Sequence, residues 1–162
     1  MKMIRLLLIE DNRLLREGIN SMLKSQRDIK IVAVSGSSED TVSQIHQLKP
    51  NVILLDIGLR SQNSLRIVEI VKKKFPQARV IIMDLAPVQG DIIQYVKAGA
   101  FGFILKDITP KDFLITIRSV AEGPKILPPH LTGTLFSQII EHADQSRKNK
   151  AKRSCADDQT RT

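Results

Sequence analysis

Short apolar runs alternate with amphipathic segments up to about residue 122 of this chain, and the alternation constrains the fold more than any other feature. The runs are nearly continuous in Leu, Ile and Val, as expected of strands covered on both faces of a parallel sheet. They span residues 5–9, 29–34, 52–55, 80–83 and 102–105. Apolar residues recur at helical spacing over residues 14–26, 38–48, 65–74, 91–98 and 110–122. The pattern predicts an α/β fold, a (βα)5 doubly wound five-stranded parallel sheet.

Helix-end signals indicate where this domain stops. Thr109 is a good N-cap, Pro110 suits the first helical position, and Gly123 ends the last helix of the core. Ser38 is expected to cap the second helix, and an extra C-terminal helix is expected over residues 131–142. We therefore assign residues 1–123 to the folded domain, 124–143 to an appended helix and the start of a linker, and 144–162 to a basic, disordered linker or tail.

Composition excludes several classes of protein. One Cys in 162 residues excludes a disulfide framework and a Cys-based zinc site, and it favours a cytoplasmic protein. No apolar run approaches the roughly 18 residues of a membrane span. The net charge of +8 permits a polyanionic partner, but a chain with no Trp and one Tyr lacks a platform on which nucleic-acid bases stack. The basic run at residues 147–153 is interpreted as a solvated tail rather than a DNA contact.

Charged side chains follow four of the five predicted strands. Glu10 and Asp11 follow the first strand, Asp56 the third, Asp84 the fourth and Lys106 the fifth. Because the carboxyl ends of parallel strands meet at one edge of the sheet, these side chains are expected to share one crevice. Clustered carboxylates repel one another unless a cation lies among them, and oxygen ligands of this kind suit Mg²⁺. A lysine beside them suits a phosphate oxygen, so the pattern predicts phosphate chemistry with Mg²⁺.

The motifs at these strand ends resemble a known family. Over about residues 3–122 the chain resembles the receiver domain of bacterial two-component response regulators, which has the CheY-like fold. The matching segments are Leu-Ile-Glu-Asp-Asn at 8–12, Leu-Leu-Asp-Ile at 54–57, Ala-Gly-Ala at 98–100 and Gly-Phe-Ile-Leu-Lys-Asp at 102–107. Residues 12–18 and 105–107 are similar to the LuxR/NarL-type branch, in which a helix-turn-helix domain follows the receiver.

The resemblance implies a role for each of these residues. Asp56 is the phosphoryl acceptor, and Lys106 contacts the phosphoryl group. Phe103 occupies the position of the switch aromatic, although an aromatic residue on a short strand also serves simply as core. The residues implied to bind Mg²⁺ are Glu10, Asp11, Asp56 and, through its backbone carbonyl, Gly58.

The resemblance also implies partners and a kind of output. It implies a signalling domain rather than an enzyme, with a sensor histidine kinase as its partner, and it leaves a homodimer open. Transcription is the expected output, but DNA would be reached only through a DNA-binding domain, which we do not find after residue 144. We therefore expect either a truncated chain or a stand-alone receiver.

One departure from the family pattern leaves a second hypothesis open. Receivers of this family have Ser or Thr at the end of the fourth strand, whereas this chain has Asp84, which when ionised cannot donate a hydrogen bond. The loop after Asp56 also lacks the proline usual there. The alternative is a phosphorylation-independent pseudo-receiver, a protein-interaction module in which Asp84 pairs with Lys106. A small Mg²⁺-dependent phosphohydrolase fits less well, since such enzymes need a second Asp where this chain has Gly58.

Overall fold

A computed structural model describes residues 3–36, 40–56, 64–85, 89–105 and 107–123 of the chain, with the backbone alone at residues 84, 85 and 89–91. These residues all belong to one compact unit, Met1–Pro128. The helix predicted at residues 131–142 lies outside the described residues, as does the basic tail. None of the helices in the described part of the chain has the length and apolar content needed to cross a membrane.

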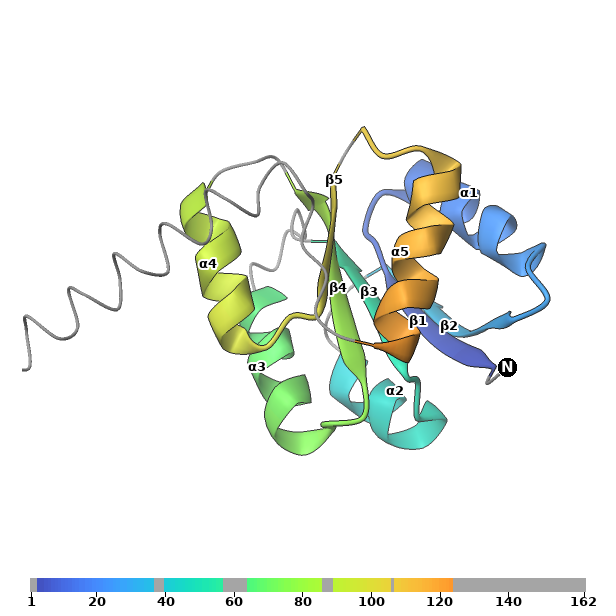
Figure 1. The fold of residues 1–162 in the computed structure, drawn as a ribbon. Helices are drawn as coiled ribbons and strands as arrows, with labels where there is room; N and C mark the ends of the chain where they lie inside the picture. The colour runs from blue at the N-terminus through green and yellow to red at the C-terminus, as the bar shows by residue number, and fades with distance from the viewer. Residues whose placement is uncertain (1–2, 37–39, 57–63, 86–88, 106, 124–162) are drawn as a thin grey trace, which may run out of the picture. The chain divides into compact units, whose positions relative to one another are not determined.

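Five parallel strands form one sheet, as the sequence predicts, and their order is β2-β1-β3-β4-β5 (Figure 1). The strands are β1 Ile4–Ile9, β2 Ile29–Ser35, β3 Val52–Asp56, β4 Arg79–Leu85 and β5 Gly102–Leu105. The chain passes from β1 outward to β2 and then back across β1 to β3. The order therefore reverses between β1 and β3, and a ligand crevice is expected at this point.

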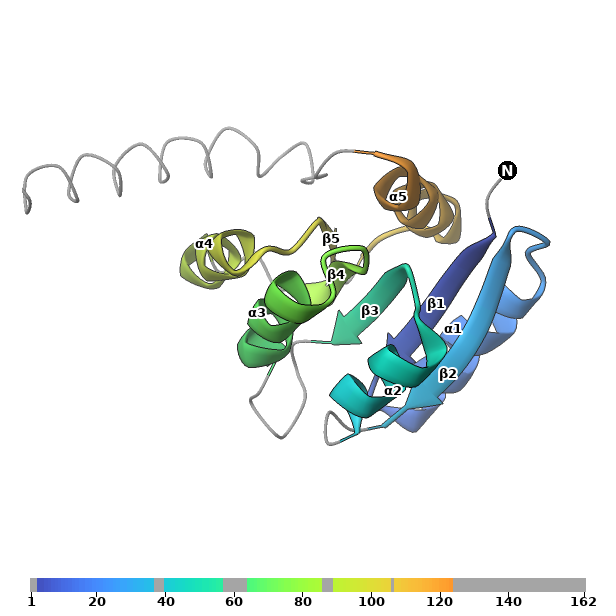
Figure 2. The ribbon, with the colours of Figure 1, turned by 90° about the horizontal axis from the view of Figure 1, so that it is seen from below.

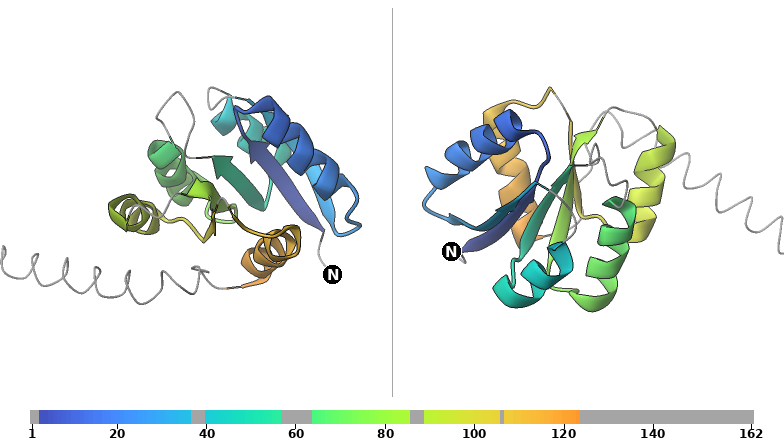
Figure 3. Two further views of the ribbon diagram at one scale, coloured as in Figure 1. Left: turned by 90° about the horizontal axis from the view of Figure 1, so that it is seen from above. Right: turned by 180° about the vertical axis from the view of Figure 1, so that it is seen from behind.

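Five helices cover the two faces of the sheet. They are α1 Arg13–Lys24, α2 Thr41–Leu48, α3 Ser64–Lys74, α4 Gln89–Ala98 and α5 Pro110–Glu122. Helices α1 and α5 lie on one face, and α2, α3 and α4 lie on the other (Figures 2 and 3). Alternate strand residues such as Leu6, Leu8 and Leu54 pack against Ile19 and Ile117 in the core below α1 and α5. Because helices cover both faces, the strands read as continuous apolar runs.

Local signals account for the start of α5 and the end of α2. Thr109 caps α5 by accepting a hydrogen bond from the Asp112 N–H (3.1 Å), and Pro110 opens the helix, both as predicted. Lys49 ends α2 in the left-handed conformation with φ 50°. The cap predicted at Ser38 lies outside the described residues, and the described part of α2 begins at Thr41.

Candidate functional site

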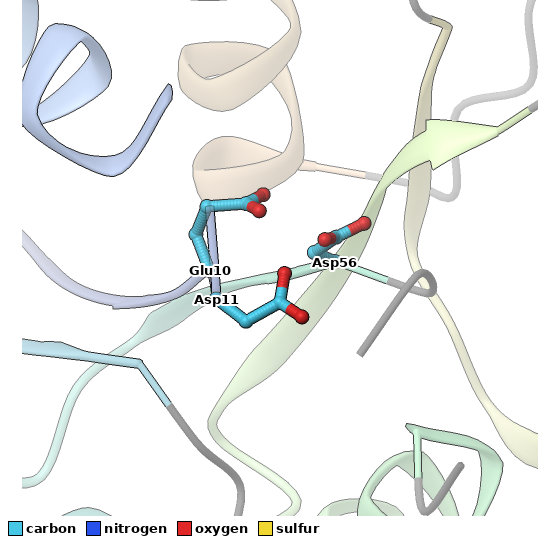
Figure 4. A group of neighbouring side chains, drawn as sticks. All are labelled: Glu10, Asp11 and Asp56. Atoms are coloured by element: carbon cyan, nitrogen blue, oxygen red, sulfur yellow. The ribbon is translucent and has the colours of Figure 1, made fainter. Parts of the chain in front are cut away.

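Three carboxylates meet at the point where the strand order reverses. Glu10 and Asp11 directly follow β1, and Asp56 is the last residue of the neighbouring strand β3. The parallel register pairs Ile9 with Leu55, so the residues that follow them come side by side. Figure 4 shows the three side chains converging, and one oxygen from each lies within 4.8 Å of the others. The structure thus brings together the three acidic side chains predicted as metal ligands.

Backbone hydrogen bonds at the helix starts hold these residues in place. Oε1 of Glu10 accepts from the Asn12 N–H (3.1 Å), and the Asn12 side chain caps α1 by accepting from the Leu15 N–H (3.1 Å). On the other strand, Oγ of Ser64 donates to the backbone carbonyl of Asp56 at 3.3 Å, in buried surroundings. The sequence analysis did not identify Ser64. The feature that could have pointed to it is a serine at the start of the helix that follows β3, where a hydroxyl often bonds to nearby backbone.

The electrostatics of the cluster are unfavourable for negative charge. Glu10 and Asp56 are only 1% and 3% exposed. Burial, a side-chain hydrogen bond with Asp56 and the charges of Asp56 and Asp11 together raise the pKa of Glu10 to about 8, against the Asn12 N–H bond that lowers it. Two unit charges at the 4.8 Å separation repel by about 3–4 kcal/mol at an effective dielectric constant of about 20. The site therefore favours either a bound proton or a bound cation.

The donor set fits a small divalent cation. Oε2 of Glu10 is buried and has no hydrogen-bond partner among the residues that the structure describes. A buried acceptor without a donor is costly, and a cation at this position satisfies it. Asp11 is half-buried, so water has access to part of this residue. Three oxygen ligands with access to water are what Mg²⁺ accepts, because it retains several waters.

Of the four remaining predicted site residues, two lie among the described residues. Gly58 and Lys106 lie outside the described residues. Asp84 was expected to end the fourth strand, but β4 continues to Leu85. The register of β4 with β5 shifts between Ile82 and Leu85, so Asp84 lies at a bulge and the strand continues past it. Phe103 is buried on β5 and pairs in register with Ile82.

Comparisons with known proteins agree on one family. Residues 6–118 match the model of the response regulator receiver domain. The nitrate/nitrite response regulator NarL of Escherichia coli K12 is 28% identical over 134 residues, which are 83% of this chain and 62% of NarL. The response regulator VraR of Staphylococcus aureus is 26% identical over 141 residues, which are 87% of this chain and 68% of VraR. This chain thus spans about two thirds of the length of these relatives.

A solved structure agrees with both the fold and the family. The response regulator domain of Thermotoga maritima CheB superposes with a TM-score of 0.68 at 26% identity. The match covers 75% of this chain and 98% of that domain.

Proposed function

The chain belongs to the response regulator receiver family, and on that premise we propose that it accepts a phosphoryl group on Asp56 and so controls an output. The observation that carries the proposal is the convergence of three carboxylates at the crevice between β1 and β3. We place the receiver at residues 1–123, with the segments 124–143 and 144–162 leading away from it. Receivers of this family are signalling modules, and we assign this one to the cytoplasm.

The proposed chemistry is transfer of a phosphoryl group to a carboxylate oxygen. An Asp56 oxygen attacks the phosphorus of a phosphohistidine, the P–N bond breaks, and an acyl phosphate forms while the histidine nitrogen leaves with the bonding electrons. Glu10, Asp11, Asp56 and the Gly58 carbonyl would hold Mg²⁺, whose positive charge would offset the repulsion between carboxylate and phosphate. Lys106 contacts the phosphoryl oxygens as a point charge.

The partners follow from the same proposal. A sensor histidine kinase donates the phosphoryl group, and two copies of the phosphorylated chain are candidates for a homodimer. NarL and VraR are response regulators, and this chain corresponds to 62% and 68% of their lengths. We propose that transcription is the output and that it is exerted through a DNA-binding domain outside this sequence.

Phosphorylation by a small donor tests the proposal. The full chain is incubated with acetyl phosphate and Mg²⁺ and then examined by intact mass spectrometry. We expect a mass gain of one phosphoryl group in the parent and none in Asp56→Asn. Asp112→Asn is the matched control, because Asp112 is an exposed aspartate in the first turn of α5. A parent that gains no mass, or an Asp56→Asn variant that still gains it, contradicts the proposal.

A second candidate function is favoured by Asp84. This residue lies at the bulge of β4, where the family has Ser or Thr, and a carboxylate about 5 Å from a phosphoryl group costs roughly 3 kcal/mol per unit charge. The chain would then be a pseudo-receiver that binds partners without phosphorylation, with Asp84 and Lys106 paired. That ion pair lies outside the described side chains and stays a prediction.

The variant Asp84→Thr separates the two functions. Threonine removes the repulsion and restores a hydroxyl donor, so we expect phosphorylation to become faster or to last longer than in the parent. A parent that gains no mass while Asp84→Thr gains one phosphoryl group supports the pseudo-receiver. Equal phosphorylation of the two proteins shows that Asp84 does not act on the acceptor, and the pairing with Lys106 is then wrong.

A further inference from the structure

An arginine in the first turn of α1 reaches back to the acidic cluster. Nη1 of Arg16 donates a hydrogen bond to the backbone carbonyl of Glu10 at 3.1 Å. Side chains on a helix lean toward its N-terminus, so a long side chain at this place reaches the residues that precede the helix. The carbonyl that it binds belongs to the peptide unit joining Glu10 to Asp11, from which two of the three clustered carboxylates extend.

The space that the guanidinium occupies is available because residue 36 is a glycine. A Cβ added at Gly36 would overlap with Nη1 of Arg16. The same end of β2 holds Glu10 from its other side, since the Glu10 N–H donates to the Ser35 carbonyl at 2.9 Å. The backbone of Glu10 is therefore held at both its N–H and its C=O, by β2 and by α1.

We propose that Arg16 is a positioning residue for the metal site and that Gly36 leaves the space in which its guanidinium lies. The inference rests on the proposed function, because that proposal places Mg²⁺ at this cluster. The Glu10–Asp11 peptide unit joins two of the three clustered residues, so a change in the Glu10 ψ or Asp11 φ angle displaces one side chain relative to the other. Repulsion among the clustered carboxylates, once they are ionised, favours such a displacement. The hydrogen bond from Arg16 fixes that peptide unit, so the oxygens stay converged before the cation arrives.

Four single variants of the full chain, and the double variant Arg16→Ala/Gly36→Ala, test the inference with Mg²⁺ alone as the probe. Arg16→Ala removes the donor, and Gly36→Ala displaces the guanidinium while leaving every charge in place. Arg13→Ala controls for lost positive charge, because Arg13 is exposed on the same helix. Gly18→Ala controls for the glycine change, because an added Cβ there has no neighbour within 4 Å. Amide NMR titrations give the Kd for Mg²⁺, and thermal unfolding with EDTA gives the stability of the metal-free protein.

We expect both Arg16→Ala and Gly36→Ala to weaken Mg²⁺ binding about tenfold, as is typical when a residue that supports metal ligands is lost. The double variant should be no weaker than either single one, because both changes remove the same hydrogen bond. The two controls should bind Mg²⁺ like the parent. The metal-free melting temperature should change little in Arg16→Ala and Gly36→Ala, whereas Gly18→Ala should raise it, because alanine replaces glycine inside a helix. Should Arg16→Ala fail to fold, Gly36→Ala carries the test, since it keeps the arginine.

Three results overturn the inference. The first is a Kd for Mg²⁺ in Gly36→Ala that lies within twofold of the parent's. The second is a loss of Mg²⁺ affinity in Arg13→Ala equal to that in Arg16→Ala. The third is a double variant in which the two single losses of Mg²⁺ affinity multiply. A parent that does not bind Mg²⁺ at all has a different meaning, because it overturns the proposed metal site itself.

Discussion

Removing the charge of Glu10 should stabilise the metal-free protein, by an amount that depends on pH. Glu10 has its pKa raised from the ordinary 4.5 to about 8 by burial and by the carboxylates of Asp56 and Asp11. Between these two pH values the folded protein keeps a proton that the unfolded chain has released. The contribution of Glu10 to the free energy of unfolding is therefore fully present below pH 4.5 and is lost as the pH rises toward 8. The loss from this one group is about 1 kcal/mol at pH 5 and about 3 kcal/mol at pH 7.

The variant Glu10→Gln isolates this effect. Glutamine keeps the acceptor for the Asn12 N–H and has no charge to desolvate. The free energy of unfolding is measured by urea denaturation with EDTA at pH 5, 6, 7 and 8. We expect the stability of the variant relative to the parent to grow by about 2–3 kcal/mol between pH 5 and pH 7. Glu17→Gln is the matched control, because Glu17 is exposed in an ion pair with Arg13 and should change little with pH.

Two outcomes refute the reasoning about Glu10. A stability difference between variant and parent that is the same at pH 5 and pH 7 shows that Glu10 does not carry the shifted titration. A variant less stable than its parent at pH 7 shows that the carboxylate contributes more as an acceptor than it costs as a buried charge. Saturating Mg²⁺ should raise the melting temperature of the parent more than that of Glu10→Gln, because ligands stabilise the state that binds them.

Two smaller predictions concern contacts that hold the domain around the site. Arg118 on α5 donates two hydrogen bonds to the Asp28 carboxylate (2.8 and 3.0 Å), and these bonds hold the pKa of Asp28 below 3.8. Asp28→Asn should therefore lower the free energy of unfolding by at most about 1 kcal/mol in urea denaturation at pH 7. The difference from the parent should vanish as the pH falls below 3.8 and the parent's Asp28 becomes protonated; a difference that persists there contradicts the assignment. Ser64→Ala should cost about 1 kcal/mol and slow phosphorylation of Asp56, because it removes a hydroxyl that donates to the buried Asp56 carbonyl. The exposed Ser43→Ala on α2 is its control in both assays, and equal effects of the two changes would refute the role of Ser64.

The sheet was predictable because its signals are local. Continuous apolar runs such as Val52–Leu55 identify buried parallel strands, and Thr109 followed by Pro110 marks the start of a helix. The convergence of Glu10 with Asp56 was predictable because parallel topology alone places strand ends together. Arg16 and Ser64 could not be found in this way, because a side chain that binds a backbone carbonyl depends on distances that the sequence pattern does not contain.

Strand β4 shows the same limit at the level of the backbone. Its predicted end came from the polar side chain of Asp84, on the assumption that a charged residue ends a buried strand. The strand instead continues to Leu85, with a register shift against β5 after Ile82. A bulge depends on how two strands pair rather than on the composition of either, so a pattern read along one strand does not reveal it.

The strained electrostatics of the site are a consequence of the same residues that make the fold stable. Leu8 and Ile9 precede Glu10 in the chain, Leu54 and Leu55 precede Asp56, and all four are fully buried. These side chains fill the two faces of the sheet, and they also exclude the water that would otherwise solvate the carboxylates. A substitution that admitted water near Glu10 would lower its pKa only by opening the core. The unfavourable charge is therefore relieved from outside, by a proton or a cation, and this makes the stability of the domain sensitive to what binds at the edge of its sheet.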